Sequence, residues 1–367
     1  MTATPDGERG WVDLDRLAGW FRDFGEADTK DLPLYRSISV AMSEDRSLLE
    51  VMTNARAGQW RPVLFFAALH FAVLEHPEHE LSAFYPSVTG RAAPARDPVP
   101  ALRRFMTDHV DELAELIATR STQTNEVNRS CLWFVALRHA ASDPTAADRP
   151  IALLEIGASA GLNLHVDEYR YDFGDGSVRG VATSPVSLAC DVVAGAPPLD
   201  AALPPIVDRR GLDLLPIDPS DATEARWLKA CVWAEQLERH RRLDAALAHA
   251  IAHPVPIVRD DAIDGLSDAI DSFPDDAHAV VVNSWVMTYI AKDRRAAFES
   301  VLDLAGSNRL LTWVSAEGSG VVPSVIAPAG LGSADTVVGM SRWRDGERRD
   351  EVVAICHPHL RWLDWRA

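Results

Sequence analysis

Residues 151–164 constrain the fold more than any other part of the chain. The apolar run Ile151-Ala-Leu-Leu-Glu-Ile156 leads directly into the small residues of Gly157-Ala-Ser159-Ala-Gly161. A short apolar run that ends in glycine is typical of a buried parallel strand. We expect a helix to start at this turn. Small residues would let a ligand approach the backbone closely there, and the helix N-terminus would offer it free N–H groups.

The rest of the second half of the chain repeats short apolar runs, at residues 205–207, 255–258, 279–282, 310–314, 336–340 and 352–356. Helical patterns fill most of the gaps, most clearly at residues 222–252 and 293–305, whereas residues 169–193 look like an inserted hairpin. Strands that alternate with helices predict an α/β fold with a mostly parallel sheet. The first 145 residues have helical periodicity instead. We therefore expect a helical N-terminal domain at residues 1–145 and an α/β domain at residues 146–367.

Three kinds of site use a glycine turn after a strand. Dinucleotide-binding folds require GxGxxG, but Ser159 and Leu162 stand where the second and third glycines should be. A serine hydrolase requires GxSxG, which Gly157-Ala-Ser159-Ala-Gly161 matches, with Asp293 and His357 as the later acid and histidine. The hydrolase elbow normally follows several strands, whereas helical sequence precedes this one and about six candidate strands follow it.

The third kind is the nucleoside-binding turn of class I S-adenosylmethionine-dependent methyltransferases. Glu155-Ile-Gly157-Ala-Ser159-Ala-Gly161 resembles its pattern, an acid two residues before a small-residue turn. The resemblance implies a Rossmann-like domain in which Glu155 binds the cationic amino-acid part of the cofactor. It also implies that Gly157, Ser159 and Gly161 let the backbone approach the nucleoside. We add Asn163, from the same run, to the cofactor-binding residues.

Acidic residues recur at later predicted strand ends. Gly211-Leu-Asp213-Leu-Leu-Pro216 resembles the methyltransferase segment that holds the ribose hydroxyls, so Asp213 is our ribose ligand, with Asp172 as a rival. Asp261, beside Asp260, resembles the acid near the adenine amino group. Parallel sheets bind ligands at the carboxyl ends of their strands, where these residues and Asn283 fall. Alternatively, each of them caps a helix or ends a strand.

The chain as a whole resembles a family of uncharacterised bacterial proteins, common in actinobacteria and known as a domain of unknown function. The resemblance covers nearly the full length. It depends on Pro33-Leu-Tyr35, Thr119-Arg-Ser-Thr-Gln-Thr-Asn-Glu126, the glycine turn up to Asn163, Gly211-Leu-Asp213 and Trp227-Leu-Lys-Ala-Cys-Val-Trp233. It implies a helical N-terminal region fused to a methyltransferase-like domain, and supplies no reaction.

The polar run at residues 119–126 lies between two apolar helical stretches. One interpretation is a loop in which Thr124 or Asn125 caps the next helix. The other is a polar wall over the strand ends, in which Arg120, Gln123, Asn125, Glu126 and Arg129 contact cofactor or acceptor. On the second interpretation Glu126 and Asn283 are our candidate catalytic residues, through contacts with the acceptor.

Composition limits the partners. Lys and Arg number 36 and Asp and Glu 54, a formal net charge of −18, which disfavours nucleic acid and anionic membranes. The four cysteines form no CxxC pair and the start lacks the apolar core of a signal peptide, so we expect a cytoplasmic protein. His249 and His253, four residues apart, have no acid beside them in sequence, and we predict no metal site.

These observations favour methyl transfer from S-adenosylmethionine to a small-molecule acceptor. The alternatives are a nucleotide-binding protein of the same fold without transfer, and the serine hydrolase described above. The oligomeric state is left open.

Overall fold

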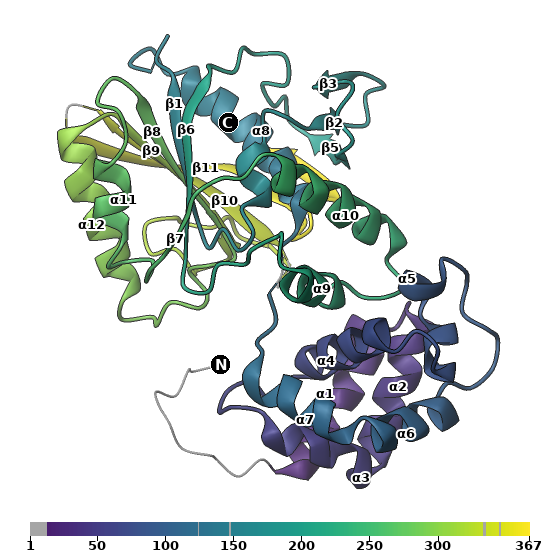
Figure 1. Cartoon of the computed structure of the whole chain (residues 1–367). Helices are drawn as coiled ribbons and strands as arrows, with labels where there is room; N and C mark the ends of the chain where they lie inside the picture. The colour runs from purple at the N-terminus through teal and green to yellow at the C-terminus, as the bar shows by residue number, and fades with distance from the viewer. Residues whose placement is uncertain (1–12, 124, 147, 333–334, 345) are drawn as a thin grey trace. The chain divides into compact units, whose positions relative to one another are not determined.

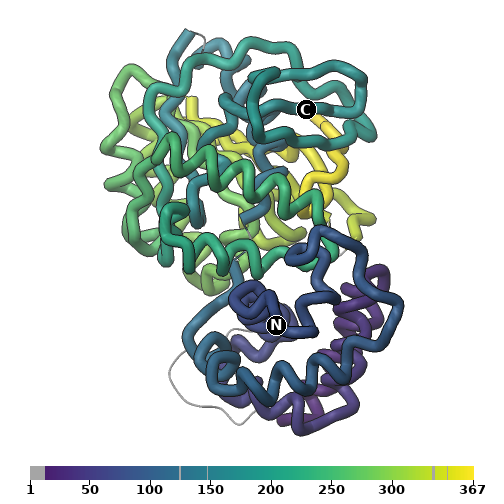
Figure 2. The backbone as a smooth tube through the Cα atoms, turned by 45° about the vertical axis from the view of Figure 1, so that its right-hand side comes forward, coloured from purple at the N-terminus to yellow at the C-terminus, as the bar shows by residue number. Residues whose placement is uncertain are grey.

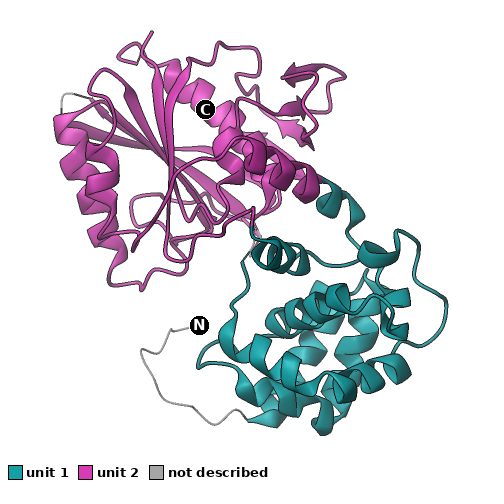
Figure 3. Ribbon diagram, in the orientation of Figure 1, with its two compact units in different colours: residues 1–124, 221–241 teal, residues 125–220, 242–367 magenta. Residues whose placement is uncertain are grey.

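The computed structural model describes residues 13–123, 125–146, 148–332, 335–344 and 346–367. The chain forms two compact units, and each draws on two stretches of sequence (Figure 3). The helical unit takes residues 1–124 and 221–241, and the sheet unit takes residues 125–220 and 242–367. These ranges differ from the expected 1–145 and 146–367, because residues 125–145 pack with the sheet and residues 221–241 pack with the helices.

The helical unit is built around α4 (Pro62–Glu75), which is apolar on all sides and almost wholly buried. A helix without a polar face needs neighbours all around it, and the other helices supply them. These are α1 (Leu14–Asp23), α2 (Pro33–Glu44), α3 (Arg46–Leu49), α5 (Pro86–Thr89), α6 (Val99–Asp108), α7 (Val110–Thr119) and α9 (Ala222–Ala230). Shorter helical turns cover Phe24–Asp28, Glu50–Asn54 and Glu80–Phe84.

The expected single helix over residues 222–252 is wrong, because the chain changes unit within it. Trp227 and Ala230 of α9 are buried in the core of the helical unit, together with Ala234 in the segment that follows. A second helix, α10 (Leu237–Ala252), continues into the sheet unit from residue 242 onward. The two ends of the segment therefore bury their apolar residues in different cores.

The sheet unit contains a nine-stranded sheet in the order β5-β12-β11-β10-β9-β8-β1-β6-β7. Five neighbouring strands are parallel: β7 (Ile257–Arg259), β6 (Ile206–Asp213), β1 (Ile151–Ile156), β8 (His278–Ser284) and β9 (Leu311–Gly318). Beyond β9 the antiparallel strands are β10 (Thr336–Arg344), β11 (Glu347–Cys356) and β12 (Trp362–Trp365), and β5 (Asp191–Ala194) pairs with β12. The prediction of an α/β fold with a mostly parallel sheet is thus confirmed.

The five parallel strands lie in the chain order third, second, first, fourth, fifth, so the strand order reverses at β1. Open parallel sheets bind ligands at such a reversal, beyond the carboxyl ends of the strands. Helices cover both faces: α11 (Leu266–Asp271) and α12 (Arg295–Asn308) lie on one side, and α8 (Ser130–Ala141) and α10 on the other (Figure 1). None of the described helices is long and apolar enough to cross a membrane.

The expected helix after the glycine turn is absent. A four-residue 3-10 turn, Leu162–His165, is followed by a small sheet of β2 (Arg170–Asp172), β3 (Val178–Gly180) and β4 (Ser187–Ala189). The Tyr169 hydroxyl donates to the Leu162 carbonyl at 2.5 Å and the Tyr171 hydroxyl to that of Val166 at 2.6 Å, so a helix would have to share these acceptors. The predicted insertion at residues 169–193 is confirmed, and its last strand runs beside the C-terminal strand (Figure 2).

Candidate functional site

The glycine turn lies at β1, where the strand order reverses, and every second residue of the turn has a positive φ angle. Gly157, Ser159 and Gly161 have φ values of 71°, 52° and 68°, in the left-handed region that favours glycine. A Cβ at Gly157 would lie 2.3 Å from Cγ2 of Val286. Both the backbone angle and the packing therefore require glycine at this position.

Asp213, at the end of β6, holds this turn in place. Its Oδ2 accepts a hydrogen bond from the Ser159 N–H at 2.7 Å, and its Oδ1 accepts one from the Leu215 N–H at 2.8 Å. A carboxylate oxygen has two lone pairs, so each oxygen of this half-buried side chain can accept one further bond. The rival, Asp172, lies in the small sheet, where its carboxylate accepts from the Gly174 N–H.

Glu155 is the most unusual side chain of the site. It is 4% exposed, and its Oε1 accepts a hydrogen bond from Asn163 Nδ2 at 3.1 Å, while its Oε2 has no hydrogen-bond partner among the residues that the structure describes. The hydroxyl of Ser130 donates to Asn163 Oδ1 at 2.8 Å and so turns the amide nitrogen toward Glu155. Burial raises the pKa of Glu155 to about 8, although the Asn163 hydrogen bond and the charge of Arg129 act in the opposite direction.

Glu317, near the end of β9, is a second buried carboxyl that sequence reasoning missed. Its Oε1 accepts from Asn283 Nδ2 at 2.8 Å and from the N–H groups of Val286 and Met287. Its Oε2 has no hydrogen-bond partner within the described part of the chain. Burial raises its pKa, against these hydrogen bonds and the charge of Arg129. The rule that located the other acids, an acidic residue at a parallel strand end, could have found it.

Asn283 is completely buried and engaged on both sides. Its Oδ1 accepts from the Trp313 indole N–H at 2.6 Å and its Nδ2 donates to Glu317. As it stands, the side chain positions Glu317 and Trp313 rather than facing a space where an acceptor could bind.

Glu126 precedes a short turn, Val127–Arg129, that leads into α8, and its Oε1 accepts from the Asn128 N–H at 3.2 Å. The N-terminal cap is therefore Glu126 and not Asn125. The other expected cap, Thr124, lies outside the described residues. Glu126 Oε2 is 3.2 Å from His359 Nδ1, and the Arg242 guanidinium is 3.8 Å from Glu126 Oε1.

The predicted polar wall is divided between the two units. Arg120 and Gln123 belong to the helical unit, where Arg120 pairs with Glu224 at 2.6 Å. Asn125, Glu126 and Arg129 belong to the sheet unit. There Arg129 donates to the carbonyls of Ser284 and Pro358 at 3.3 Å, near the buried carboxyls.

Comparison with known proteins identifies a family for this chain but no protein of known structure. The model of a family of uncharacterised proteins conserved in bacteria, DUF2332, matches residues 18–365. The chain belongs to this family. No curated protein and no solved structure matches it. The DUF2332 match spans both units, so the family is defined by the helical unit and the sheet unit together.

In this DUF2332 protein Asp261 is also already engaged. Its Oδ1 accepts from the Ile263 N–H at 2.9 Å and pairs with Arg294 at 3.2 Å, and Asp260 Oδ1 accepts from the Asp261 N–H. Asp261 follows the end of β7, as the sequence predicted, but a ligand amino group would share it with Arg294.

The geometry of the glycine turn lends no support to a serine hydrolase. Ser159 Oγ is buried without a hydrogen-bond partner, so no described histidine activates it. The ring of His357 instead accepts from the His359 N–H at 3.0 Å. A hydrolase requires the serine and its base within hydrogen-bond reach of each other.

Proposed function

We propose that this DUF2332 protein binds S-adenosylmethionine at the glycine turn and directs methyl transfer to a small-molecule acceptor. The observation that carries the proposal is the unpartnered Oε2 of Glu155, buried where the strand order reverses. Leaving a buried carboxyl oxygen unpaired costs free energy, which a cationic ligand group would offset. The amino-acid part of S-adenosylmethionine carries such a group.

Each predicted binding residue has a role in this proposal. Glu155, oriented by Asn163, takes the ammonium group, and the left-handed turn from Gly157 through Ser159 to Gly161 keeps side chains away from the nucleoside. The remaining lone pairs of Asp213 accept from the ribose hydroxyls. Asp261 is the candidate for the adenine amino group.

When bound, the sulfonium supplies an activated methyl group, so the protein has to orient the acceptor and, where needed, remove its proton. Glu126 beside His359 is the pair that we assign to the acceptor. The positive charge of Arg129 favours the ionised forms of Glu155 and Glu317, against the effect of burial. Asn283 contributes by holding Glu317 in place.

The engagement of Asn283 and Asp261 by protein partners favours a second candidate, a protein of this fold that binds the nucleoside without transfer. In that case the ligand would bind at Glu155 and Asp213, and no acceptor would react. The two candidates share the binding step and differ only in turnover.

Calorimetry with S-adenosylhomocysteine tests the binding step. We expect binding by the wild type and a large loss in Glu155→Gln. Asp213→Ala should weaken binding by about 1–3 kcal/mol through lost hydrogen bonds. Asp172→Ala, the matched control in the small sheet, should leave it unchanged.

Absence of binding at millimolar ligand contradicts both candidates. Where binding is found, methyl-labelled S-adenosylmethionine incubated with fractionated small molecules separates them. Labelled product supports transfer, and binding without any product supports the second candidate.

A further inference from the structure

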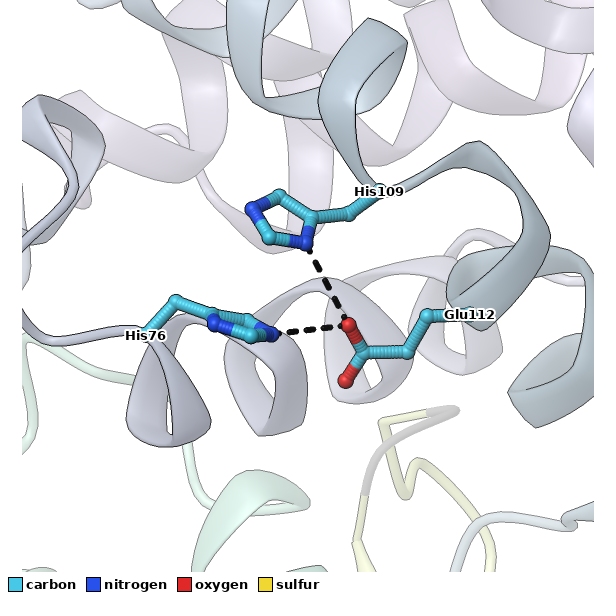
Figure 4. A group of neighbouring side chains, drawn as sticks. All are labelled: His76, His109 and Glu112. Atoms are coloured by element: carbon cyan, nitrogen blue, oxygen red, sulfur yellow. Dashed lines mark hydrogen bonds and ion pairs between the residues drawn. The ribbon is translucent and has the colours of Figure 1, made fainter.

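A cluster of metal-ligating side chains lies in the helical unit, whereas the glycine turn and its acids belong to the sheet unit (Figure 4). His76 follows the end of α4, His109 joins α6 to α7, and Glu112 is in the first turn of α7. Glu112 Oε2 is 2.9 Å from His76 Nε2 and 3.4 Å from His109 Nδ1. Both imidazole rings thus direct a nitrogen at the same carboxylate oxygen.

We propose that His76, His109 and Glu112 bind a divalent transition metal ion, and that Zn²⁺ fits the site. The three ligand atoms all lie within 4.8 Å of one another. Zn²⁺ binds imidazole nitrogen and carboxylate oxygen at about 2.0–2.2 Å, so its ligand atoms in a tetrahedron are about 3.3 Å apart. The observed separations need only small side-chain movements to reach that geometry.

The surroundings prepare these side chains for an ion. The rings of His76 and His109 pack with centroids 4.0 Å apart, and the Phe105 ring packs 4.4 Å from His109. The Glu78 carboxylate lies 3.8 Å from Nδ1 of His76, the nitrogen that does not face Glu112. At that distance Glu78 makes no hydrogen bond to the ring, and it contributes only the attraction of an exposed negative charge.

Access and charge also favour an ion here. The side chains of His76 and Glu112 are each 31% exposed and that of His109 is 20% exposed, so an ion can enter from solvent. Within the described residues no Arg or Lys forms an ion pair with Glu112. The carboxylate charge is therefore available to a metal.

A second cluster of the same composition, His165, Glu168 and His249, serves as the natural competitor. In this cluster Glu168 Oε2 lies 2.5 Å from His249 Nε2. The fold thus gives His249 a neighbouring acid, although none lies beside it in the sequence. Arg209, however, already pairs with Glu168 at 3.3 Å, and His165 is almost fully buried. A cation beside the carboxylate disfavours a second cation, and we assign the metal to the first cluster.

With three protein ligands, the fourth position falls to water or to a further ligand. The ion would tie the end of α4 to the start of α7, two segments 36 residues apart in the chain. The helical unit would gain stability from any ion that binds the folded state and not the unfolded one.

The proposal is tested by isothermal titration calorimetry, in which Zn²⁺ is added to the full-length protein after treatment with a chelator. We expect one strong site per chain, no comparable binding of Mg²⁺, and visible absorption on adding Co²⁺. Glu112→Gln and His109→Gln should each weaken Zn²⁺ binding by at least about 100-fold, and Glu78→Gln, which removes only an exposed charge, by no more than about 5-fold. Glu115→Gln, on the exposed face of the same helix, is the matched control and should bind as the wild type does.

Histidine footprinting of the wild type gives an answer even if a ligand variant does not fold. Zn²⁺ should protect His76 and His109 from diethyl pyrocarbonate and leave the extent of labelling at His249 unchanged. The proposal is overturned if Zn²⁺ fails to bind at all. It is equally overturned if binding survives His109→Gln and disappears in His249→Gln.

Discussion

Two buried ionisable side chains, His70 in the helical unit and Glu155 in the sheet unit, differ in how completely their polar atoms are hydrogen-bonded. In the helical unit, His70 is fully buried, and its ring nitrogens lie 3.1 Å from the Ala230 carbonyl oxygen and 2.7 Å from the Ser87 hydroxyl. In the sheet unit, Glu155 is buried with one oxygen hydrogen-bonded, and no described residue bonds to the other. A buried polar group with every partner in place is part of the packing, whereas one that lacks a partner marks a position where a ligand can complete it.

The contrast also predicts opposite responses to pH. Burial lowers the pKa of His70 to about 3 and raises that of Glu155 to about 8. Between pH 3 and 6.5 the unfolded chain binds a proton at His70 that the folded chain does not, so the helical unit loses stability as the pH falls. Between pH 4.5 and 8 the folded chain keeps a proton on Glu155 that the unfolded chain releases, so the sheet unit loses stability as the pH rises.

The largest effect should come from Gly157→Val, which disrupts the turn of the sheet unit. Val286 leaves no room for a side chain, and a β-branched residue is strained at a positive φ. We expect a loss of roughly 2–6 kcal/mol of unfolding free energy in urea, from strain and overpacking together. Gly320→Val, at a φ of 72° with nothing within 4 Å, controls for the strain alone. Equal losses in both variants would mean that Val286 yields freely.

Glu155→Gln should remove the alkaline loss of stability. Between pH 5 and 7.5 the unfolding free energy of the wild type should fall by about 3 kcal/mol relative to that of the variant, at about 1.4 kcal/mol per pH unit. The glutamine keeps an acceptor for Asn163 and carries no charge to bury. Hydrogen exchange of β1 peptides across this pH range measures the difference, and parallel curves for the two proteins would show that Glu155 ionises freely.

The matching change in the helical unit, His70→Gln, should reduce the loss of unfolding free energy at acidic pH instead. Between pH 6.5 and 5 the wild type should lose about 2 kcal/mol relative to the variant, by the same proportionality. Exchange of α4 peptides reports it. A loss confined to β1 peptides would break the comparison, because the acid response would then arise in the wrong unit.

The smallest effect should come from Ser159→Ala. Its hydroxyl has no hydrogen bond to lose, so we expect the unfolding free energy to change by less than about 0.5 kcal/mol and S-adenosylhomocysteine affinity to be kept. A fluorophosphonate probe should not label the wild type. Stoichiometric labelling that disappears in Ser159→Ala would restore the hydrolase and make His357 the next residue to test.

Much of the sheet unit could be predicted from local sequence. The strand at residues 151–156 is found where the apolar run and the glycine predicted it, and Asp213 lies at the turn, where its strand-end position indicated. The helix expected after the turn is replaced by a 3-10 turn, and the hydroxyls of Tyr169 and Tyr171 donate to the carbonyls of Leu162, in that turn, and of Val166, just after it. Neither tyrosine carries a local signal of that role.

By itself, then, the sequence determined the α/β class, the insertion and the acids at strand ends, because apolar periodicity and glycine act over a few residues. Only the tertiary structure decided which polar groups lack partners and which histidines meet. Asn283 is engaged by Trp313 and Glu317, some 30 residues further along the chain, and the change of unit after Thr124 divides the polar wall. Such contacts depend on which segments the cores bring together, and burial then sets the pKa values and the missing partners that distinguish a binding site from packing.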